Sequence, residues 1–260
     1  MKSIDTELVN RIRHDIVVGT HSAGERLSEA QLSDFYGVSR TPIRLAVRLL
    51  EREGVIERGE GRGYMVQSPT VKDIKQAVMV RGHLESLAAR LMANAPNRKE
   101  KLPLLEEAIA SLDELIETAE LNDTSINKMQ KQNALFHHTI LENCGNDFVA
   151  FTCNKISHLP MLEVGSMAFD KKTVETVNGV ERTLFRLKLG NSQHKVIYEA
   201  IRTGDSVRAE SVMREHSNTM IEYIELFEKR HEDLSLTDLI SYSNYQLNSD
   251  YNLIDQKKET

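Results

Sequence analysis

Apolar positions repeat with helical spacing through most of this chain. Near its start, Leu8, Ile12 and Ile16 recur every four residues, and Gly19 follows them. Residues 3–18 are therefore predicted to form a helix that buries one apolar stripe and ends at the glycine.

The segment 27–67 has the pattern of a helix, a tight turn, a second helix and a hairpin, with residues 23–27 extended before it. Ser28 and Ser39 are suited to cap the two helices, and Gly37 between them suits a left-handed turn. The second helix should bury one face and present on another a stripe of arginines four residues apart: Arg40, Arg44, Arg48 and Arg52. This combination is what a recognition helix in the DNA major groove needs.

A hairpin is predicted directly after the arginine-bearing helix. Residues 55–58 and 64–67 read as two short strands, and the five residues between them include three glycines and Arg62. This connector is too rich in glycine to form a regular element, so it is expected to be the tip of a wing that can approach DNA closely.

Residues 68–70 interrupt the pattern, and helical spacing without strand-like alternation follows them. We therefore divide the chain into a winged helix-turn-helix domain at 1–68, a linker at 69–72, a helical domain at 73–232 and a polar tail at 233–260. The fold class is predicted to be mainly α, with three helices and a small β-hairpin followed by an all-α bundle. Helices are expected at 73–94, 100–121, 125–144, 192–202 and 206–230, while 172–187 shows no clear pattern.

Composition supports this fold class. The 260 residues are 40% hydrophobic and 28% charged, with no Trp and 5% aromatic residues, so the core must consist mainly of aliphatic side chains and Met. No apolar run approaches the length of a membrane span, and the N-terminus lacks the apolar region of a signal peptide. A cytoplasmic protein without membrane contact is expected, with Cys144 and Cys153 as reduced thiols.

The formal net charge of −6 is unevenly distributed. Residues 1–68 contain ten Lys and Arg against ten Asp and Glu, so the acidic excess lies entirely after them. Affinity for phosphate depends on the local patch rather than on the sum. A site-specific DNA-binding protein is therefore favoured over one that coats DNA.

Together these residues resemble the GntR family of bacterial transcription regulators. The resemblance rests on LSEAQLS at 27–33, SRTPIR at 39–44, RLLEREGVIE at 48–57 and the glycine-rich wing. The second half resembles the FadR-type subgroup with the helical effector domain called FCD. Its landmarks are Arg81 and Glu85, NALFHHTILENCGN at 133–146, QHKVIYEAIRTGD at 193–205 and MREH at 213–216. The resemblance covers roughly residues 5–230.

The resemblance implies that Ser39, Arg40, Thr41 and Arg44 contact operator DNA and that Gly61, Arg62 and Gly63 form the wing tip. The arginine stripe adds Arg48 as a further candidate for DNA contact. The chemistry agrees, because arginines in the first turns of the helix can pair bidentately with guanine and hydroxyls can donate to phosphate. For Arg48 the alternative is an ion pair with Glu51 or a neighbouring helix. Ala30 stands where the family often has a basic residue, so one contact is expected to be missing or displaced.

A divalent transition metal site, for Zn, Ni or Mn, is also implied, with Asn133, His137, His194 and His216 as ligands. Asn133 and His137 are four residues apart and share a helix face, and converging imidazoles suit such a metal. The family has Asp at the position of Asn133, and a neutral amide is a poorer ligand. Weak metal binding, completion of the site by an effector carboxylate, and loss of the metal all stay open.

Arg81 and Glu85 are implied to line an effector pocket, in which Arg81 would clamp a carboxylate. The alternative for this pair is an intrahelical ion pair, since the two residues are also four apart.

The expected function is therefore a ligand-responsive transcription regulator, a repressor in the usual pattern of the family. It would bind a palindromic operator as a homodimer and respond to a small organic or sugar acid, with help from the metal. Two alternatives stay open, a regulator whose helical domain only dimerises and a metalloenzyme tethered to DNA. Motifs such as HExxH, GxSxG and the P-loop are absent from the sequence, so we expect no enzyme activity.

Overall fold

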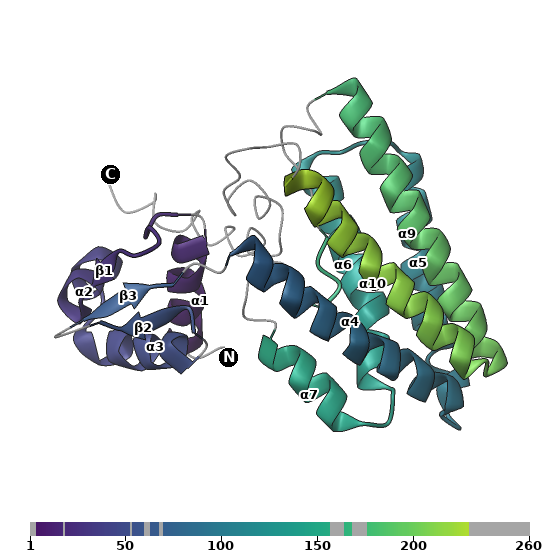
Figure 1. The fold of residues 1–260 in the computed structure, drawn as a ribbon, viewed down its shortest axis with the longest axis horizontal. Helices are drawn as coiled ribbons and strands as arrows, with labels where there is room; N and C mark the ends of the chain where they lie inside the picture. The colour runs from purple at the N-terminus through teal and green to yellow at the C-terminus, as the bar shows by residue number, and fades with distance from the viewer. Residues whose placement is uncertain are drawn as a thin grey trace, which may run out of the picture. The chain divides into compact units, whose positions relative to one another are not determined.

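The structure is a computed structural model that describes residues 4–17, 19–52, 54–59, 63–67, 70–156, 164–167 and 176–228. The chain divides into two compact units, one ending at Lys72 and the other beginning at Asp73. The first unit combines helices with a small sheet, and the described part of the second is helical (Figure 1). The predicted mainly α fold class, with a winged helix followed by a helical domain, is confirmed.

The first unit is built on helices α1 (Ile4–Val17), α2 (Glu29–Tyr36) and α3 (Arg40–Arg52). Their apolar faces meet in one core, in which Ile12 and Ile43 are fully buried. The buried face of α3 consists of four residues with no exposed surface: Ile43, Ala46, Val47 and Leu50. Burial of this face fixes the rotation of α3 and turns its arginines outward.

Helix α2 begins and ends as its sequence predicts. The backbone N–H of Gln31 donates to the Ser28 hydroxyl over 3.2 Å, and the Gln31 side chain accepts from the Ser28 backbone N–H over 2.9 Å. This reciprocal capping box satisfies donors that the helix itself cannot. Gly37 ends the helix with φ at 66°, in the left-handed region that a residue without Cβ adopts at little cost.

A sheet closes the first unit, and in the described residues it has the strand order β1-β3-β2. The predicted hairpin corresponds to β2 (Ile56–Arg58) and β3 (Tyr64–Val66), which are antiparallel. A third strand, β1 (Arg26–Leu27), pairs with β3 on its other side. The sequence predicted an extended segment there but not its pairing, because two residues carry no alternation that could reveal a partner.

The second unit contains α4 (Val71–Asn94), α5 (Leu102–Glu117), α6 (Asp123–Glu142), α7 (Asp147–Ile156), α9 (Val177–Thr203) and α10 (Ser206–Glu228), with the short 3-10 helix η1 (Arg98–Glu100). Helix α4 begins at Val71, inside the predicted linker at 69–72. Helix α5 packs against α6 and α9, and α9 packs against α10 (Figure 1). Fully buried Phe136 and Met92 lie in the main core of this unit.

Helix α9 begins much earlier than its predicted start at 192. Thr176 caps it by accepting a hydrogen bond from the Gly179 N–H over 3.1 Å. The periodicity is weak because the buried face of the first turns carries Thr183 and Asn191 among its apolar residues. A hydrophobicity pattern does not reveal a helix whose buried face carries polar groups. In α9 these groups indicate that part of the interior of the second unit is polar.

Helices α4 and α10 approach each other closely at Gly82. A Cβ at that position would lie only 2.7 Å from the Cβ of Ser217, so a larger residue would force the helices apart. The contact lies one residue from His216, and it therefore helps to place the α4 side chains beside those of α10. Among the described helices, none is both long and apolar enough to cross a membrane.

Candidate functional site

Most exposed side chains of α3 are polar, and Leu45, which is 44% exposed, is the apolar exception. Ser39, Arg40, Thr41, Arg44 and Arg48 are all exposed, and together with Arg52 they surround the free side of the helix. Guanidinium groups and hydroxyls that are exposed to solvent can replace their bound water with base edges and phosphates. The structure thus places five of the predicted DNA-contacting residues on one accessible face.

Arg44 has a partner that the sequence did not suggest. Its Nη2 lies 2.9 Å from Oε2 of Glu29 on α2, and its Nε lies 3.2 Å from both carboxylate oxygens. The side chain of Arg44 is 55% exposed and that of Glu29 is 27% exposed. The hydrogen bond from Arg44 lowers the pKa of the Glu29 carboxyl, so the pair is ionised at neutral pH.

The wing is described only at its base. Gly59 donates its N–H to the Gly63 carbonyl over 3.1 Å, and Gly63 has φ at 139°. A Cβ on Gly63 would lie 3.0 Å from the Leu27 carbonyl oxygen, so glycine is needed where the wing passes β1. The predicted tip residues Gly61 and Arg62 lie outside the described residues.

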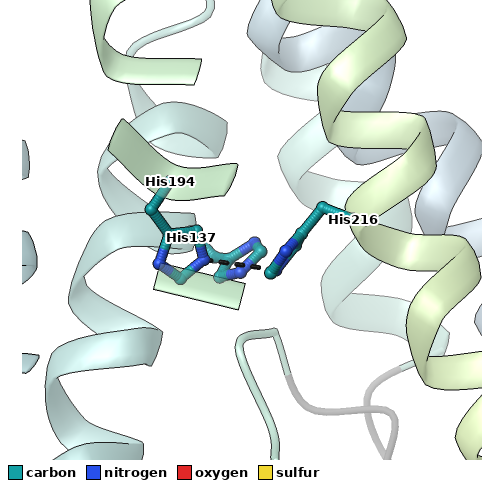
Figure 2. Close-up of side chains that lie close together, drawn as sticks. All are labelled: His137, His194 and His216. Carbon is teal, nitrogen blue, oxygen red and sulfur yellow. Dashed lines mark hydrogen bonds between the residues drawn. The ribbon is translucent and has the colours of Figure 1, made fainter. Parts of the chain in front are cut away.

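Three predicted ligands from separate helices meet inside the second unit. His137 comes from α6, His194 from α9 and His216 from α10, and one ring nitrogen from each lies within 4.8 Å of the others. Figure 2 shows the three rings gathered at one point. His137 is 4% exposed and His194 is 1% exposed, so this cluster is not a surface coincidence.

Each imidazole has an oxygen partner at its Nδ1. Nδ1 of His137 lies 3.0 Å from Oε2 of Glu85, and Nδ1 of His216 lies 2.9 Å from Oε1 of Gln193. Nδ1 of His194 faces Oδ1 of Asn191 at 3.4 Å. The oxygens of Asn191 and Gln193 can accept a proton from Nδ1 of His194 and His216, and a ring protonated there keeps its Nε2 lone pair, as a metal ligand requires.

The orientation of Asn191 follows from its other hydrogen bonds. Its Nδ2 donates to Oδ1 of Asp113 over 2.8 Å and to the Ile109 carbonyl over 3.1 Å, and both of these atoms can only accept. Oδ1 of Asn191 must therefore be the atom that faces His194. This network assigns the tautomer of His194 independently of any metal.

The electrostatics of the cluster keep its members ready to bind a cation. Burial and the neighbouring His137 lower the pKa of His216 to about 3, and burial with both neighbouring imidazoles lowers the pKa of His194 well below its ordinary value. Burial alone would raise the pKa of Glu85, but His137 and Arg81 outweigh it and lower that pKa to about 2. At neutral pH His194 and His216 are therefore neutral imidazoles beside an ionised carboxylate, a donor set that suits a divalent transition metal.

Arg81 and Glu85 form a buried ion pair beside the histidines. Nε of Arg81 lies 3.2 Å from Oε1 of Glu85, and the two side chains are 7% and 3% exposed. Nη1 of Arg81 also donates to the Ser166 hydroxyl over 3.4 Å. The pair is compatible with both interpretations of the sequence, the intrahelical ion pair and the effector pocket. Its members are ion-paired along the helix and also line the cavity next to the histidines.

Asn133 occupies the edge of the same cavity. Its Nδ2 donates to the Gly165 carbonyl over 2.7 Å, which leaves Oδ1 as the atom available for any cation. A Cβ on Gly165 would lie 2.5 Å from the Cα of Ala134, so segment 164–167 passes very close to α6. The role of Asn133 as a metal ligand remains a prediction. In the structure its amide hydrogen-bonds segment 164–167 to α6.

Both polar and apolar side chains line the cavity. Arg81, Asn133 and the three histidines are among the polar residues, and the apolar residues include Leu112, Ile116, Met167, Leu187 and Met220. Arg186 also lines it, with its guanidinium 4.2 Å from the centre of the Tyr223 ring. A small anion with an apolar or polar body fits such a lining.

Sequence reasoning missed Glu29, Arg186, Asn191 and Gln193. Gln193 directly precedes His194, and Asn191 lies three residues before it on the same helix. A search for oxygen-bearing side chains within one turn of each candidate ligand would have found both. Glu29 and Arg44 are on different helices, and only the packing of α2 against α3 reveals their contact.

The fold and these sites define a class of protein, a DNA-binding regulator in which a winged helix is joined to a helical domain with a histidine-lined cavity. A sequence profile described as "Bacterial regulatory proteins, gntR family" matches residues 5–66, and one described as "FCD domain" matches residues 76–219. The chain belongs to the GntR family of transcription regulators, and its second half is an FCD domain.

Individual relatives agree with this assignment. The HTH-type transcriptional regulator YdhC of Bacillus subtilis is 32% identical over 136 residues, which are 52% of this chain and 58% of that protein. The HTH-type transcriptional repressor GlaR of Escherichia coli is 21% identical over 217 residues, 82% of this chain and 92% of that protein. A solved structure, E. coli McbR/YncC, has a TM-score of 0.58 at 18% identity and covers 87% of this chain and 99% of its own. That structure shows the same fold.

Proposed function

We propose that this protein is a ligand-responsive repressor that binds a palindromic operator as a homodimer. The exposed arginine face of α3 is the observation that supports DNA binding. The guanidinium groups of residues 40, 44 and 48 lie along one side of a helix whose other side is buried. One such helix reads only a few base pairs, so two copies related by a two-fold axis are needed for a specific site. The domain limits of 1–68 and 73–232 remain a prediction, and the predicted tail at 233–260 lies outside the described residues.

We infer that the helical domain binds a small organic or sugar acid with a divalent metal. The donor set of three histidines, each with an oxygen at Nδ1, supports a metal held by His137, His194 and His216. When bound, the metal would supply a Lewis-acidic position for a carboxylate oxygen. Arg81 on the cavity wall is the residue proposed to contact the anion, and Glu85 holds both Arg81 and His137 in place.

Regulation requires that the acid bind one arrangement of the dimer more tightly than the other. Segment 164–167 and helices α4, α6, α9 and α10 all contribute to the cavity wall, so an occupant would act on several elements at once. We propose that occupancy changes the separation of the two recognition helices and releases the operator.

A second function keeps the DNA binding and removes the metal. Asn133 in place of the family Asp favours it, because a neutral amide is a poorer metal ligand than a carboxylate. In that case the helical domain would only dimerise. A DNA-tethered metalloenzyme is less well supported, because the family consists of transcription regulators.

Metal analysis and a thermal-shift screen separate these functions. The purified chain and the variant His194→Ala are melted with organic and sugar acids, with and without added Zn, Ni or Mn, because a ligand that binds only the folded state raises the melting temperature. A metal-dependent shift in the wild type that the variant lacks supports the proposed function. If no acid or metal shifts the melting temperature of either protein, a helical domain that only dimerises is favoured.

A further inference from the structure

Glu29 lies at the first position of α2 and faces the arginine stripe of α3. Its carboxylate contacts Arg44, and the positive charges of Arg40 and Arg48 act on it as well. A carboxylate at the DNA-facing surface opposes phosphate, so its presence there calls for an explanation. Glu29 was not among the residues predicted to contact DNA.

The contact uses one particular edge of the guanidinium group. Glu29 accepts from Nε over 3.2 Å and from Nη2 over 2.9 Å, which is the side edge of the Arg44 fork. A guanidinium has five N–H donors. Two are therefore engaged with Glu29, and the end edge, which carries both Nη1 donors and the second Nη2 donor, points away from the carboxylate. An end edge of this kind matches O6 and N7 of guanine.

We propose that Glu29 is a specificity-determining residue of the DNA interface, which holds Arg44 by its side edge so that the end edge reads a guanine. This inference rests on the proposed binding of an operator by α3. The pair persists in the complex, and Glu29 acts as a positioning residue rather than as a base contact.

Two consequences follow from the physics of the pair. Fixing a long side chain before binding removes part of the entropy cost of ordering it at the base edge. The affinity for the correct base therefore increases. The negative charge also weakens attraction to phosphate at every DNA sequence alike. Glu29 therefore raises the ratio of specific to non-specific affinity in two ways: it strengthens binding to the correct base and weakens binding to DNA of any sequence.

A purely structural role for Glu29 is less well supported. The N-terminus of α2 is capped by Ser28 and Gln31 through their reciprocal hydrogen bonds, and Glu29 takes no part in that box. The Glu29 side chain is 27% exposed, and its partner Arg44 is itself 55% exposed. Such an exposed pair contributes little to folding.

The test uses the full chain and a duplex selected from random DNA by the wild-type protein. Each base pair of that duplex is then substituted in turn, and affinities are measured for wild type, Arg44→Ala, Glu29→Gln and the double variant. The position at which Arg44→Ala abolishes the preference for guanine is the one that Arg44 reads. Asp34→Asn is the matched control, since Asp34 is exposed on the same helix and the charge change is the same.

We expect Glu29→Gln to lower the preference for guanine at that position by about tenfold. Affinity for unselected DNA should stay equal or rise, and Asp34→Asn should leave the preference unchanged. In the Arg44→Ala background, Glu29→Gln should have no further effect on discrimination, because Glu29 acts through Arg44. Melting curves of all variants serve to check that each one is folded.

A folded Glu29→Gln protein that keeps the full guanine preference would overturn the inference and leave the proposed operator binding intact. Equal losses of discrimination in the presence and absence of Arg44 would also overturn it, because Glu29 would then contact DNA independently. A wild-type protein that selects no sequence at all would overturn both the inference and the proposed function.

Discussion

Nε2 of His194 lies 3.2 Å from Nε2 of His216 (Figure 2). This is a hydrogen-bonding distance, so without a cation one Nε2 carries the shared proton. With both ring protons on Nδ1, where side-chain oxygens face them, both Nε2 lone pairs would be available to a cation. Two ligands on one tetrahedral zinc ion, with Zn–N distances of about 2.0–2.1 Å, would be roughly 3.3 Å apart. The separation of these two atoms therefore suits a shared cation.

Replacement of one histidine should remove metal binding. His194→Ala deletes a ligand whose tautomer is fixed by Asn191, so we expect zinc affinity to fall by at least two orders of magnitude. The matched control is His138→Ala, because His138 is next to His137 in sequence but is not part of the cluster. Zinc titration of dialysed protein measures both, and equal affinities in the two variants would exclude His194 as a ligand.

Glu85→Gln should affect stability and metal affinity together. The substitution leaves Arg81 and His137 without their shared carboxylate in a buried site, which costs about 3–5 kcal/mol of unfolding free energy. Loss of an outer partner of a ligand should also weaken metal binding by about 10–100-fold. Urea denaturation and zinc titration report the two effects. Glu106→Gln, at an exposed position of α5, is the control and should change neither value.

Asn133→Asp should have two opposed effects. A carboxylate is a better ligand than an amide, so metal affinity should increase. The same change removes the donor to the Gly165 carbonyl and places an oxygen against it, so the metal-free protein should melt at a lower temperature. If zinc affinity is unaltered while the melting temperature falls, residue 133 fastens segment 164–167 and is not a ligand.

Arg44→Ala should weaken specific operator binding by about 1–3 kcal/mol per protomer, because a bidentate contact to one base would be lost. Arg52→Ala, at the far end of α3, should have a much smaller effect. Titrations of the selected duplex at one salt concentration make this comparison. Equal losses in both variants would indicate a general phosphate effect rather than base reading.

Acid should destabilise the metal-free protein. An unfolded histidine gains its proton below its ordinary pKa of 6.5, whereas folded His216 gains it only near pH 3. Between these values the unfolded state binds more protons, so stability falls as the pH drops through this window. Urea midpoints measured in EDTA between pH 7.5 and pH 5 should decline, and His216→Gln should decline less steeply. An identical decline in the variant would assign the effect to other groups.

The sequence predicted those features that depend on residues close together in the chain. The α2 cap at Ser28, the turn at Gly37 and the arginine face of α3 all follow from local spacing, and the structure has each of them. The convergence of three histidines required the family resemblance, because spacing alone cannot bring α6, α9 and α10 together. Their ligand role remains a prediction.

Other features could not be predicted, because packing between distant segments creates them. The contact of Glu29 with Arg44 joins two helices, and that of Asn133 with Gly165 joins residues 32 positions apart. The early start of α9 was hidden because its buried face carries Thr183 and Asn191 among its apolar residues. In each case a polar side chain has a partner that no periodicity records.

The central claim is that an acid in the histidine cavity controls operator binding. Its most direct test is a titration of the selected duplex with zinc-loaded wild type and with His194→Ala, in the presence of each organic or sugar acid that shifts the melting temperature. We expect at least tenfold weaker operator binding with one of these acids in the wild type and no change in the variant. Operator affinity that is the same with and without every such acid would contradict it.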